Sequence, residues 1–253
     1  MANKYVDFIS DEHLLGCIKN LYESYVKAKS DVTKKKFYKN KIDTFKLTFD
    51  SKFNDLDEKA IIKSEMIRQI DKSINNSIGT FHEQVLGGID GYETGVLTGY
   101  DVKANDNTLF AEVKNKHNTM SSSAAEAAFQ RLARFADDNR SAKCYLVQIL
   151  AKKSFKEKWE AIINGKEYSH SRVYKISGDQ FYFLLTGQET AFFDLYQALP
   201  KALKDFLGEQ EEVEATENSA LSDIESQTEA SGRSIFNEIT FENYSYYLGF
   251  DKL

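Results

Sequence analysis

The chain has 253 residues with 33 Lys and Arg against 39 Asp and Glu, which gives a formal net charge of -6 at pH 7. A chain of this length can bury a core without disulfides, and its two cysteines, Cys17 and Cys144, lie in apolar runs, which argues against a bridge or a cysteine metal site. Residues 1–8 lack a basic flank followed by an apolar stretch, and the sequence has no uncharged run long enough for a bilayer, so we expect a cytoplasmic protein.

The first third of the sequence has the apolar spacing of helices. From position 10 to about 29, apolar residues recur at helical intervals, and Ser10 is placed as the N-cap before an acidic first turn. A second, lysine-rich stretch covers roughly 33–49, and a third covers 57–74. We therefore expect residues 1–78 to form a helical N-terminal region that contacts DNA or a second copy of the chain.

A β-hairpin is predicted after a glycine-rich stretch. Residues 81–86 have the pattern of a short helix, which Gly87 and Gly88 end. Residues 101–104 and 108–114 then alternate between apolar and polar side chains on either side of Asn105, Asp106 and Asn107. Asn and Asp tolerate the positive φ of a tight turn, so this pattern predicts two antiparallel strands joined by a short loop.

The elements after the hairpin predict an α/β fold. Residues 121–123 are serines placed to cap a helix, and apolar residues follow at helical spacing to about 135. The near-continuous apolar run 144–150 predicts a buried strand, and 172–176 is a further short strand. Residues 178–207 are expected to be mostly helical. A hairpin, a helix and a buried strand in this order indicate a central sheet with helices packed against it.

The negative charge of the chain is concentrated near its C-terminal end. Residues 209–230 carry eight acidic side chains and no Lys or Arg, so the rest of the chain is slightly basic. This composition predicts an acidic flexible linker over 208–234. Residues 235–253 regain aromatic side chains and are expected to form a C-terminal segment that packs back.

The hairpin brings three charged side chains together. A two-residue turn at Asp106 and Asn107 would place Asp101 opposite Glu112 and Lys103 opposite Phe110. Because side chains alternate along a strand, Asp101, Glu112 and Lys114 share one face. The residues on the opposite face are all apolar: Val102, Ala104, Leu109, Ala111 and Val113.

Two carboxylates brought this close repel each other unless a cation lies between them. Magnesium takes oxygen ligands of this kind and keeps several of its waters, and a lysine two residues further along can orient one such water. The Glu-X-Lys pattern occurs once in the chain, at Glu112–Lys114. The alternative reading is that this face of the hairpin is simply solvated.

The arrangement resembles the PD-(D/E)XK nuclease superfamily. Asp101 and the Glu112–Lys114 motif lie across a hairpin, and a helix and a buried strand follow, as in that superfamily. Three segments, 111–120, 173–181 and 197–201, are similar to type II restriction endonucleases that recognise GGNCC-like sites. The resemblance covers residues 79–207. It departs from the superfamily pattern at Tyr100, where a proline often stands.

The resemblance implies a fold, an activity and a cofactor. The fold is a restriction-endonuclease-like mixed central sheet flanked by helices, with 79–207 as the catalytic core. The activity is site-specific hydrolysis of double-stranded DNA by Mg²⁺-activated water. Asp101, Glu112 and Lys114 are the implied catalytic residues, and Mg²⁺ is implied to bind at Asp101, Glu112 and Val113.

Further residues and partners follow from the same resemblance. Glu83 matches a glutamate on the helix before the hairpin and is implied to support catalysis near the metal. Lys116, His117, Asn118 and Thr119 follow the catalytic strand and would face DNA, although they also fit a polar strand end. A homodimer is expected, because a near-palindromic site needs two active sites. A DNA methyltransferase is expected as a functional companion.

Three alternatives stay open at this point. Asp90 with Asp101 and Lys103 could form the same motif one strand earlier, although Lys103 is expected to be more exposed than Lys114. A non-specific or repair-type nuclease of the same fold would use the same hairpin, and a non-catalytic DNA-binding module would keep the fold without turnover.

Overall fold

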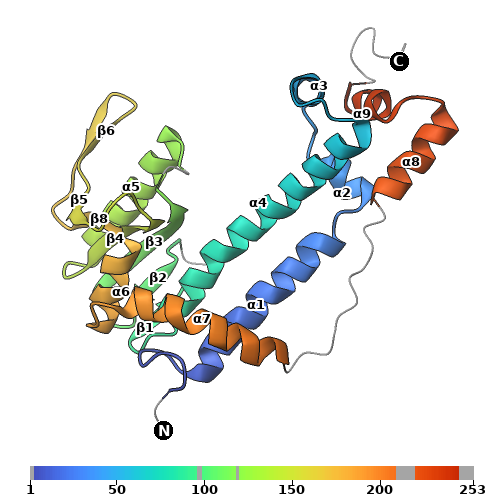
Figure 1. Ribbon diagram of the computed structural model, residues 1–253. Helices are drawn as coiled ribbons and strands as arrows, with labels where there is room; N and C mark the ends of the chain where they lie inside the picture. The colour runs from blue at the N-terminus through green and yellow to red at the C-terminus, as the bar shows by residue number, and fades with distance from the viewer. Residues whose placement is uncertain (1–2, 96–98, 118–119, 209–219, 245–253) are drawn as a thin grey trace. The chain divides into compact units, whose positions relative to one another are not determined.

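The structure is a computed structural model that describes residues 3–95, 99–117, 120–208 and 220–244 (Figure 1). The chain divides into two compact units. Unit 1 contains Met1–Leu21 and Asn76–Glu211, and unit 2 contains Tyr22–Asn75 and Glu212–Leu253. The expected N-terminal region, 1–78, is therefore divided between the two units.

Two helices run through both units. Helix α1 spans Asp11–Ser30, and α4 spans Glu58–Gly87. The expected cap is present, because the Oγ of Ser10 accepts a hydrogen bond from the backbone N–H of His13 at 3.2 Å. Helix α4 is a single helix where two were predicted. A mid-helix Gly costs only about 1 kcal/mol relative to Ala, so the helix continues through Gly79 to buried residues such as Val85.

The described part of unit 2 is helical. Besides parts of α1 and α4, it contains α2 (Lys34–Lys39), α3 (Thr44–Phe53), α8 (Ala220–Ser231) and α9 (Ile235–Tyr244). Its core consists mainly of aliphatic side chains: Val32, Phe37, Ile42, Leu47, Ile61, Ile62, Met66, Ile224 and Ile239.

Two expectations fail in unit 2. The single helix expected over 33–49 is broken between α2 and α3, where Lys41 has a φ of 47° and Asp43 caps α3 by accepting from the Lys46 N–H. The expected linker over 208–234 contains helix α8, whose Ile224 is fully buried. The acidic composition of this segment gave no indication that Ile224 would be buried. Residues 209–219 lie outside the described residues.

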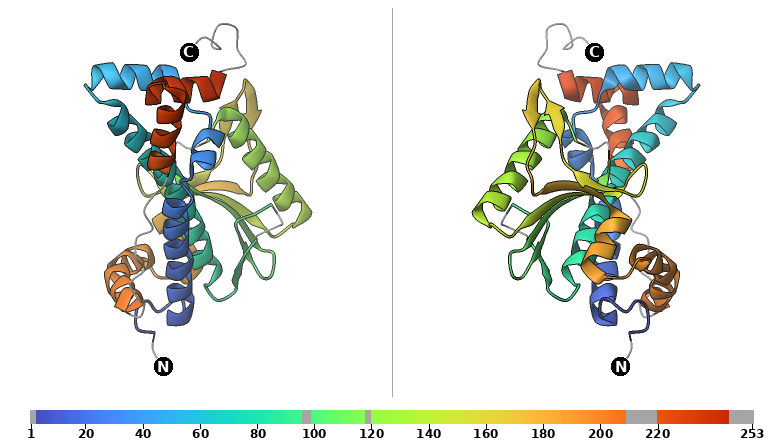
Figure 2. Two further views of the ribbon diagram at one scale, coloured as in Figure 1. Left: turned by 90° about the vertical axis from the view of Figure 1, so that its right-hand side faces the viewer. Right: turned by 90° about the vertical axis from the view of Figure 1, so that its left-hand side faces the viewer.

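Unit 1 is built on a mixed six-stranded sheet in the order β1-β2-β3-β4-β8-β5, seen in two views in Figure 2. Its strands are β1 (Tyr92–Thr94), β2 (Val102–Ala104), β3 (Leu109–Lys116), β4 (Lys143–Leu150), β8 (Val173–Ser177) and β5 (Lys156–Lys158). The central strands β3, β4 and β8 are parallel, and the outer pairs are antiparallel. A separate hairpin joins β6 (Ala161–Ile163) to β7 (Lys166–Tyr168). The predicted α/β class with a mixed sheet is confirmed.

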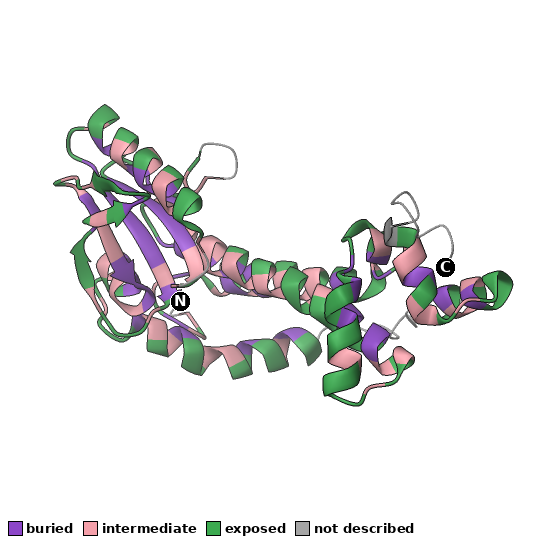
Figure 3. Ribbon diagram, turned by 90° about the horizontal axis from the view of Figure 1, so that it is seen from above, coloured by how far each residue is buried: buried purple, intermediate pink, exposed green. Residues whose placement is uncertain are grey.

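Helices cover both faces of this sheet. Helix α5 (Ser122–Asp138), capped by Ser121, packs on the face that carries Phe110, Cys144 and Leu146. Helices α6 (Gly178–Thr186) and α7 (Ala191–Gly208) follow β8, and the ring of Phe181 in α6 lies 5.8 Å from that of Tyr145 on the opposite face. Figure 3 shows the buried residues gathered along the central strands. The sheet is thus buried on both sides along most of its length.

The hairpin has the predicted register. Val102 pairs with Ala111 and Lys103 with Phe110, and the Asp101 N–H donates to the Ala111 carbonyl at 2.9 Å. Asn107 has the positive φ expected in the turn, 60°. We call the face that carries Asp101, Glu112 and Lys114 face A, and the face of Val102 and Ala111 face B.

Face A is not purely polar, which corrects the sequence-based view of the hairpin. Phe110 lies on it and is buried beneath α5 with Leu132. Glu112 and Lys114 lie on the part of face A nearer the carboxyl ends of the parallel strands. Among the described residues, no helix is long and apolar enough to cross a bilayer.

Candidate active site

The hairpin places the two carboxylates of the predicted motif next to each other. Asp101 immediately precedes β2, and its Oδ2 accepts a hydrogen bond from the backbone N–H of Val113 at 2.6 Å. Glu112 lies in the middle of β3 and is only 7% exposed. Asp101 is therefore held against the strand that carries Glu112 and Lys114.

Each oxygen of the Glu112 carboxylate contacts a cation. The Nζ of Lys114 lies 2.7 Å from Oε1, and a guanidinium nitrogen of Arg131 lies 2.6 Å from Oε2. Lys114 also donates to the Val113 carbonyl at 3.2 Å. A buried carboxylate needs such partners, because an unpaired charge in this position is strongly destabilising.

Arg131 was not predicted from the sequence. It lies on α5, whose buried residues Ala128 and Leu132 face the sheet, and its Nε is a buried nitrogen without a hydrogen-bond partner among the described residues. An arginine beside the apolar stripe of a helix is a signal that it reaches an acidic group, although the sequence does not say which one.

Helix α4 adds a third carboxylate to this cluster. Burial, with the negative charges of Asp101 and Glu112 and against the opposing charge of Lys114, raises the pKa of Glu83 to about 7. Burial and the charge of Glu112 also raise the pKa of Asp101. The neighbouring His82 is directed elsewhere, since its Nδ1 lies 3.1 Å from the Tyr182 hydroxyl. The structure thus brings Glu83 close to the hairpin carboxylates.

These residues fit a hard divalent cation. The donor set consists of the Asp101 and Glu112 carboxylates and the Val113 carbonyl, with Glu83 nearby, and all of these are oxygen ligands. Burial is the main cause of both raised pKa values and neighbouring carboxylates add to it, so a cation bound among these groups would favour their charged forms. In the described part of the chain, no group of three or more His, Cys, Asp or Glu side chains is placed to hold a metal ion. Mg²⁺ does not require one, because it binds through one or two carboxylates and retains waters.

The alternative motif is assembled differently. Lys103 lies opposite Phe110 as predicted, but its Nζ forms an ion pair with Glu93 at 3.0 Å. The expectation that Lys103 is more exposed than Lys114 is wrong: their side chains are 18% and 31% exposed. The Tyr100 ring, 5.7 Å from the Lys103 Nζ, helps to cover it. Asp90 is exposed in the loop before β1.

The predicted DNA-contacting residues are described in part. Lys116 is exposed at the end of β3, and the His117 N–H donates to the Leu150 carbonyl at 3.2 Å. Asn118 and Thr119 lie outside the described residues. His117 also lines a pocket of about 240 Å³ whose other lining residues are Gln148, Lys152, Lys153, Phe155, Glu157 and Lys175.

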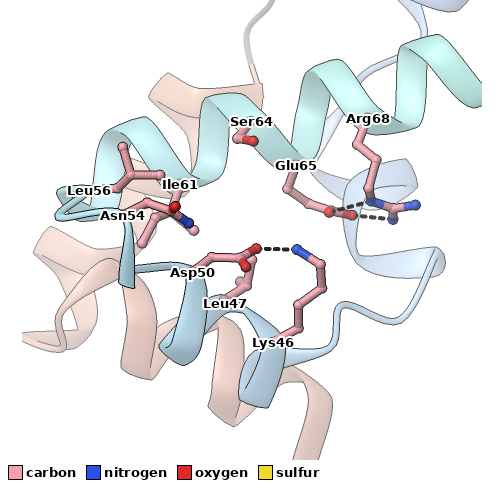
Figure 4. A pocket seen from close by; sticks show the side chains of 9 residues that line it. All are labelled: Lys46, Leu47, Asp50, Asn54, Leu56, Ile61, Ser64, Glu65 and Arg68. Carbon is pink, nitrogen blue, oxygen red and sulfur yellow. Dashed lines mark hydrogen bonds and ion pairs between the residues drawn. The ribbon is translucent and has the colours of Figure 1, made fainter. Parts of the chain in front are cut away.

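A smaller pocket, of about 150 Å³, lies between α3 and α4 in unit 2 (Figure 4). Its charged side chains are paired within the pocket, Lys46 with Asp50 and Arg68 with Glu65. This pocket does not compete with the hairpin as a candidate active site, because its charges already neutralise one another.

Comparisons with known proteins identify the family of the chain. The family described as Eco47II restriction endonuclease matches residues 6–208 of the chain. The type II restriction enzyme Sau96I of Staphylococcus aureus is 41% identical over 262 residues, which cover 99% of this chain and 100% of that protein. The type II restriction enzyme Eco47II of Escherichia coli is 30% identical over 216 residues, which cover 81% of this chain and 89% of that protein. The chain therefore belongs to the Eco47II restriction endonuclease family and is a type II restriction enzyme, a site-specific deoxyribonuclease.

Proposed function

We propose that this enzyme cleaves double-stranded DNA at a GGNCC-like site by Mg²⁺-dependent hydrolysis, with Asp101, Glu112 and Lys114 as its catalytic residues. The observation that carries the proposal is the geometry of the hairpin. Asp101 is bound to the Val113 N–H at 2.6 Å, and the Lys114 Nζ lies 2.7 Å from the Glu112 carboxylate. Two acids and one lysine thus meet on one face.

Asp101, Glu112 and the Val113 carbonyl would hold the metal. The chemistry that Mg²⁺ supplies in such a site is activation of water and neutralisation of charge on the phosphate. The short hydrogen bond from the Val113 N–H fixes the Asp101 carboxylate before a ligand arrives, and such preorganisation avoids rearrangement during the reaction.

Lys114 would orient the attacking water and bind an oxygen of the scissile phosphate. Its ammonium group has three donors, and the Val113 carbonyl and the Glu112 carboxylate accept from it. The third N–H of this ammonium group would donate to the attacking water or to the phosphate. Glu83, whose pKa is about 7, would take or return a proton near neutral pH.

The enzyme would act on both strands as a homodimer in the cytoplasm. Cleavage of both strands at a near-palindromic site needs two catalytic centres related by a two-fold axis. The host DNA would be protected by a companion DNA methyltransferase. Sedimentation with a cognate duplex tests the assembly: two chains per duplex are expected, and one chain per duplex at saturation would contradict the dimer.

Incubation with a long plasmid and Mg²⁺ tests the proposed function. Discrete fragments, whose ends map to GGNCC-like sequences, are the expected result. A smear would indicate a non-specific nuclease, and intact DNA with a gel shift would indicate a binding module without turnover. Either of these two results would contradict the proposal.

A further inference from the structure

An open pocket lies where β4 and β8 end, next to the end of β3. Seven residues line it: His117, Gln148, Lys152, Lys153, Phe155, Glu157 and Lys175, and its volume is about 240 Å³. Lys152 and Lys153 lie just after β4 and are exposed, whereas Gln148 and Lys175 are half-buried. Neither the predicted motif nor the resemblance to known nucleases assigned these four residues.

The strand register places this pocket on face A, beside the catalytic lysine. Gln148 pairs with Lys114 across the parallel strands β3 and β4, and paired residues of neighbouring strands point to the same face. Lys175 pairs with Leu146, which in turn pairs with Glu112. Neighbouring strands are about 5 Å apart, so the pocket begins one strand away from Lys114.

The lining is positively charged. Three lysines face one acidic residue, Glu157, and the ion pair that Glu157 forms with Lys175 is long, at 3.7 Å. Lys152 and Lys153 are the two lining lysines that this pair does not involve. Both of these lysines are exposed, so an anion from solvent would meet their charge.

A phosphate group fits this chemistry better than a base does. Lysine is a compact point charge that binds phosphate, and the Gln148 amide can donate a further hydrogen bond. Base recognition would need flat donors and acceptors or stacked aromatic rings, and the lining offers two rings, Phe155 and His117, against three lysines.

We propose that this pocket binds a phosphate of the DNA strand being cut, next to the scissile phosphate, and that Lys152 and Lys153 supply the charge. The inference rests on the proposed role of Lys114, because the pocket follows that residue across face A. The pocket would therefore position the strand for attack at the hairpin carboxylates.

The sheet offers a matched control for the test. Lys156 and Lys158 flank Glu157 on β5, and they pair with Ile176 and Tyr174, so they lie on face B. Replacing Lys152 and Lys153 with alanine removes the same charge as replacing Lys156 and Lys158. A difference between these two double variants therefore reports position on the sheet and not net charge.

Salt dependence of duplex binding in EDTA measures the phosphate contact without cleavage. Each neutralised phosphate contributes about 0.9 to the slope of log K against log salt. The Lys152→Ala/Lys153→Ala protein is expected to lose about 1 from the slope, and Lys156→Ala/Lys158→Ala to keep the wild-type slope. An unchanged slope in the first variant, or equal losses in both, would overturn the proposal.

Neutral methylphosphonates, placed at one phosphate of the cognate duplex at a time, locate the contact. Wild type is expected to bind more weakly when a phosphate next to the scissile one is neutral, and Lys152→Ala/Lys153→Ala should no longer sense that change. If the variant stays as sensitive as wild type at every position while both cut DNA, the pocket inference fails and the proposed function stands. If neither cuts with Mg²⁺ but the slopes still differ, the proposed function fails and phosphate binding in the pocket is supported.

Discussion

Arg131→Met removes one of the two cations that hold the Glu112 carboxylate. In the structure, Arg131 lies 2.6 Å from Oε2 and Lys114 lies 2.7 Å from Oε1. Methionine keeps much of the apolar volume of the arginine stem but leaves Oε2 without a charged partner. The variant therefore isolates the contribution of the ion pair.

The expected destabilisation is moderate. Breaking a fully buried pair costs about 3–5 kcal/mol, because one charge is left uncompensated. Here the Arg131 side chain is 31% exposed and Lys114 still balances Glu112, so we expect a loss of about 1–2 kcal/mol in the free energy of unfolding. Arg134→Met is the control, since Arg134 lies one turn further along α5 and is exposed, and its loss should stay within about 0.5 kcal/mol.

Urea denaturation followed by tryptophan fluorescence measures this loss in unit 1. Trp159 is the single tryptophan of the chain, and it is buried with its ring 5.3 Å from that of Phe129 on α5. Mg²⁺ is expected to reduce the difference between Arg131→Met and wild type, because a cation at Glu112 replaces the missing charge. Equal stability of the Arg131 and Arg134 variants, or a difference that saturating Mg²⁺ leaves unchanged, would refute this reasoning.

Three further predictions concern the core, pH and metal. Leu132→Ala, at a side chain that is 1% exposed beneath face A, should lower the stability of unit 1 by about 2–5 kcal/mol in the same assay, and a loss below about 1 kcal/mol would contradict the packing of α5. Burial opposes ionisation of Glu238, but hydrogen bonds from Ser231 and Arg233 outweigh it and hold its pKa below the ordinary 4.5. The stabilisation from its charge is therefore present above pH 4.5 and is lost as pH falls through the lowered pKa. The difference in melting temperature between wild type and Glu238→Gln, followed by circular dichroism, should therefore shrink in acid. A difference that grows in acid would count against this pairing. EDTA should stop plasmid cleavage and added Mg²⁺ should restore it, whereas full activity in EDTA would rule out the metal site.

Long and locally determined elements were predictable from the sequence. The hairpin register followed from the turn at Asn105–Asn107 and from the alternation of β3, and β4 followed from its apolar run. By contrast, β1, β5, β6 and β7 have three residues each, which is too short for a pattern with a period of two. Strands β6 and β7 pair with each other across a local turn at Asn164 and Gly165, whereas the pairing of β5 depends on β8, which is distant in sequence. The same holds for α8, where burial of Ile224 in unit 2 outweighs an acidic composition.

The residues of the candidate site also differ in how far local sequence predicted them. Asp101, Glu112 and Lys114 were identified because a strand and its turn fix their face. Glu83 was identified only through resemblance, since nothing local connects α4 to the hairpin. The positions of Arg131 and of the pocket lysines near the site could not be predicted, because they depend on tertiary packing. Helix α5 and the ends of β4 and β8 reach the site only in the folded sheet.

Single-turnover cleavage of a cognate duplex by Lys114→Ala and Lys103→Ala tests the placement of the active site most directly. Lys114 contacts Glu112, whereas Lys103 contacts Glu93, so Lys114→Ala should abolish cleavage and Lys103→Ala should lose far less. Asp101→Ala and Glu112→Ala should also abolish cleavage while DNA binding stays measurable, and Asp90→Ala should have little effect. A Lys114→Ala protein that cuts at a near wild-type rate, beside an inactive Lys103→Ala protein, would contradict the assignment and move the site one strand upstream.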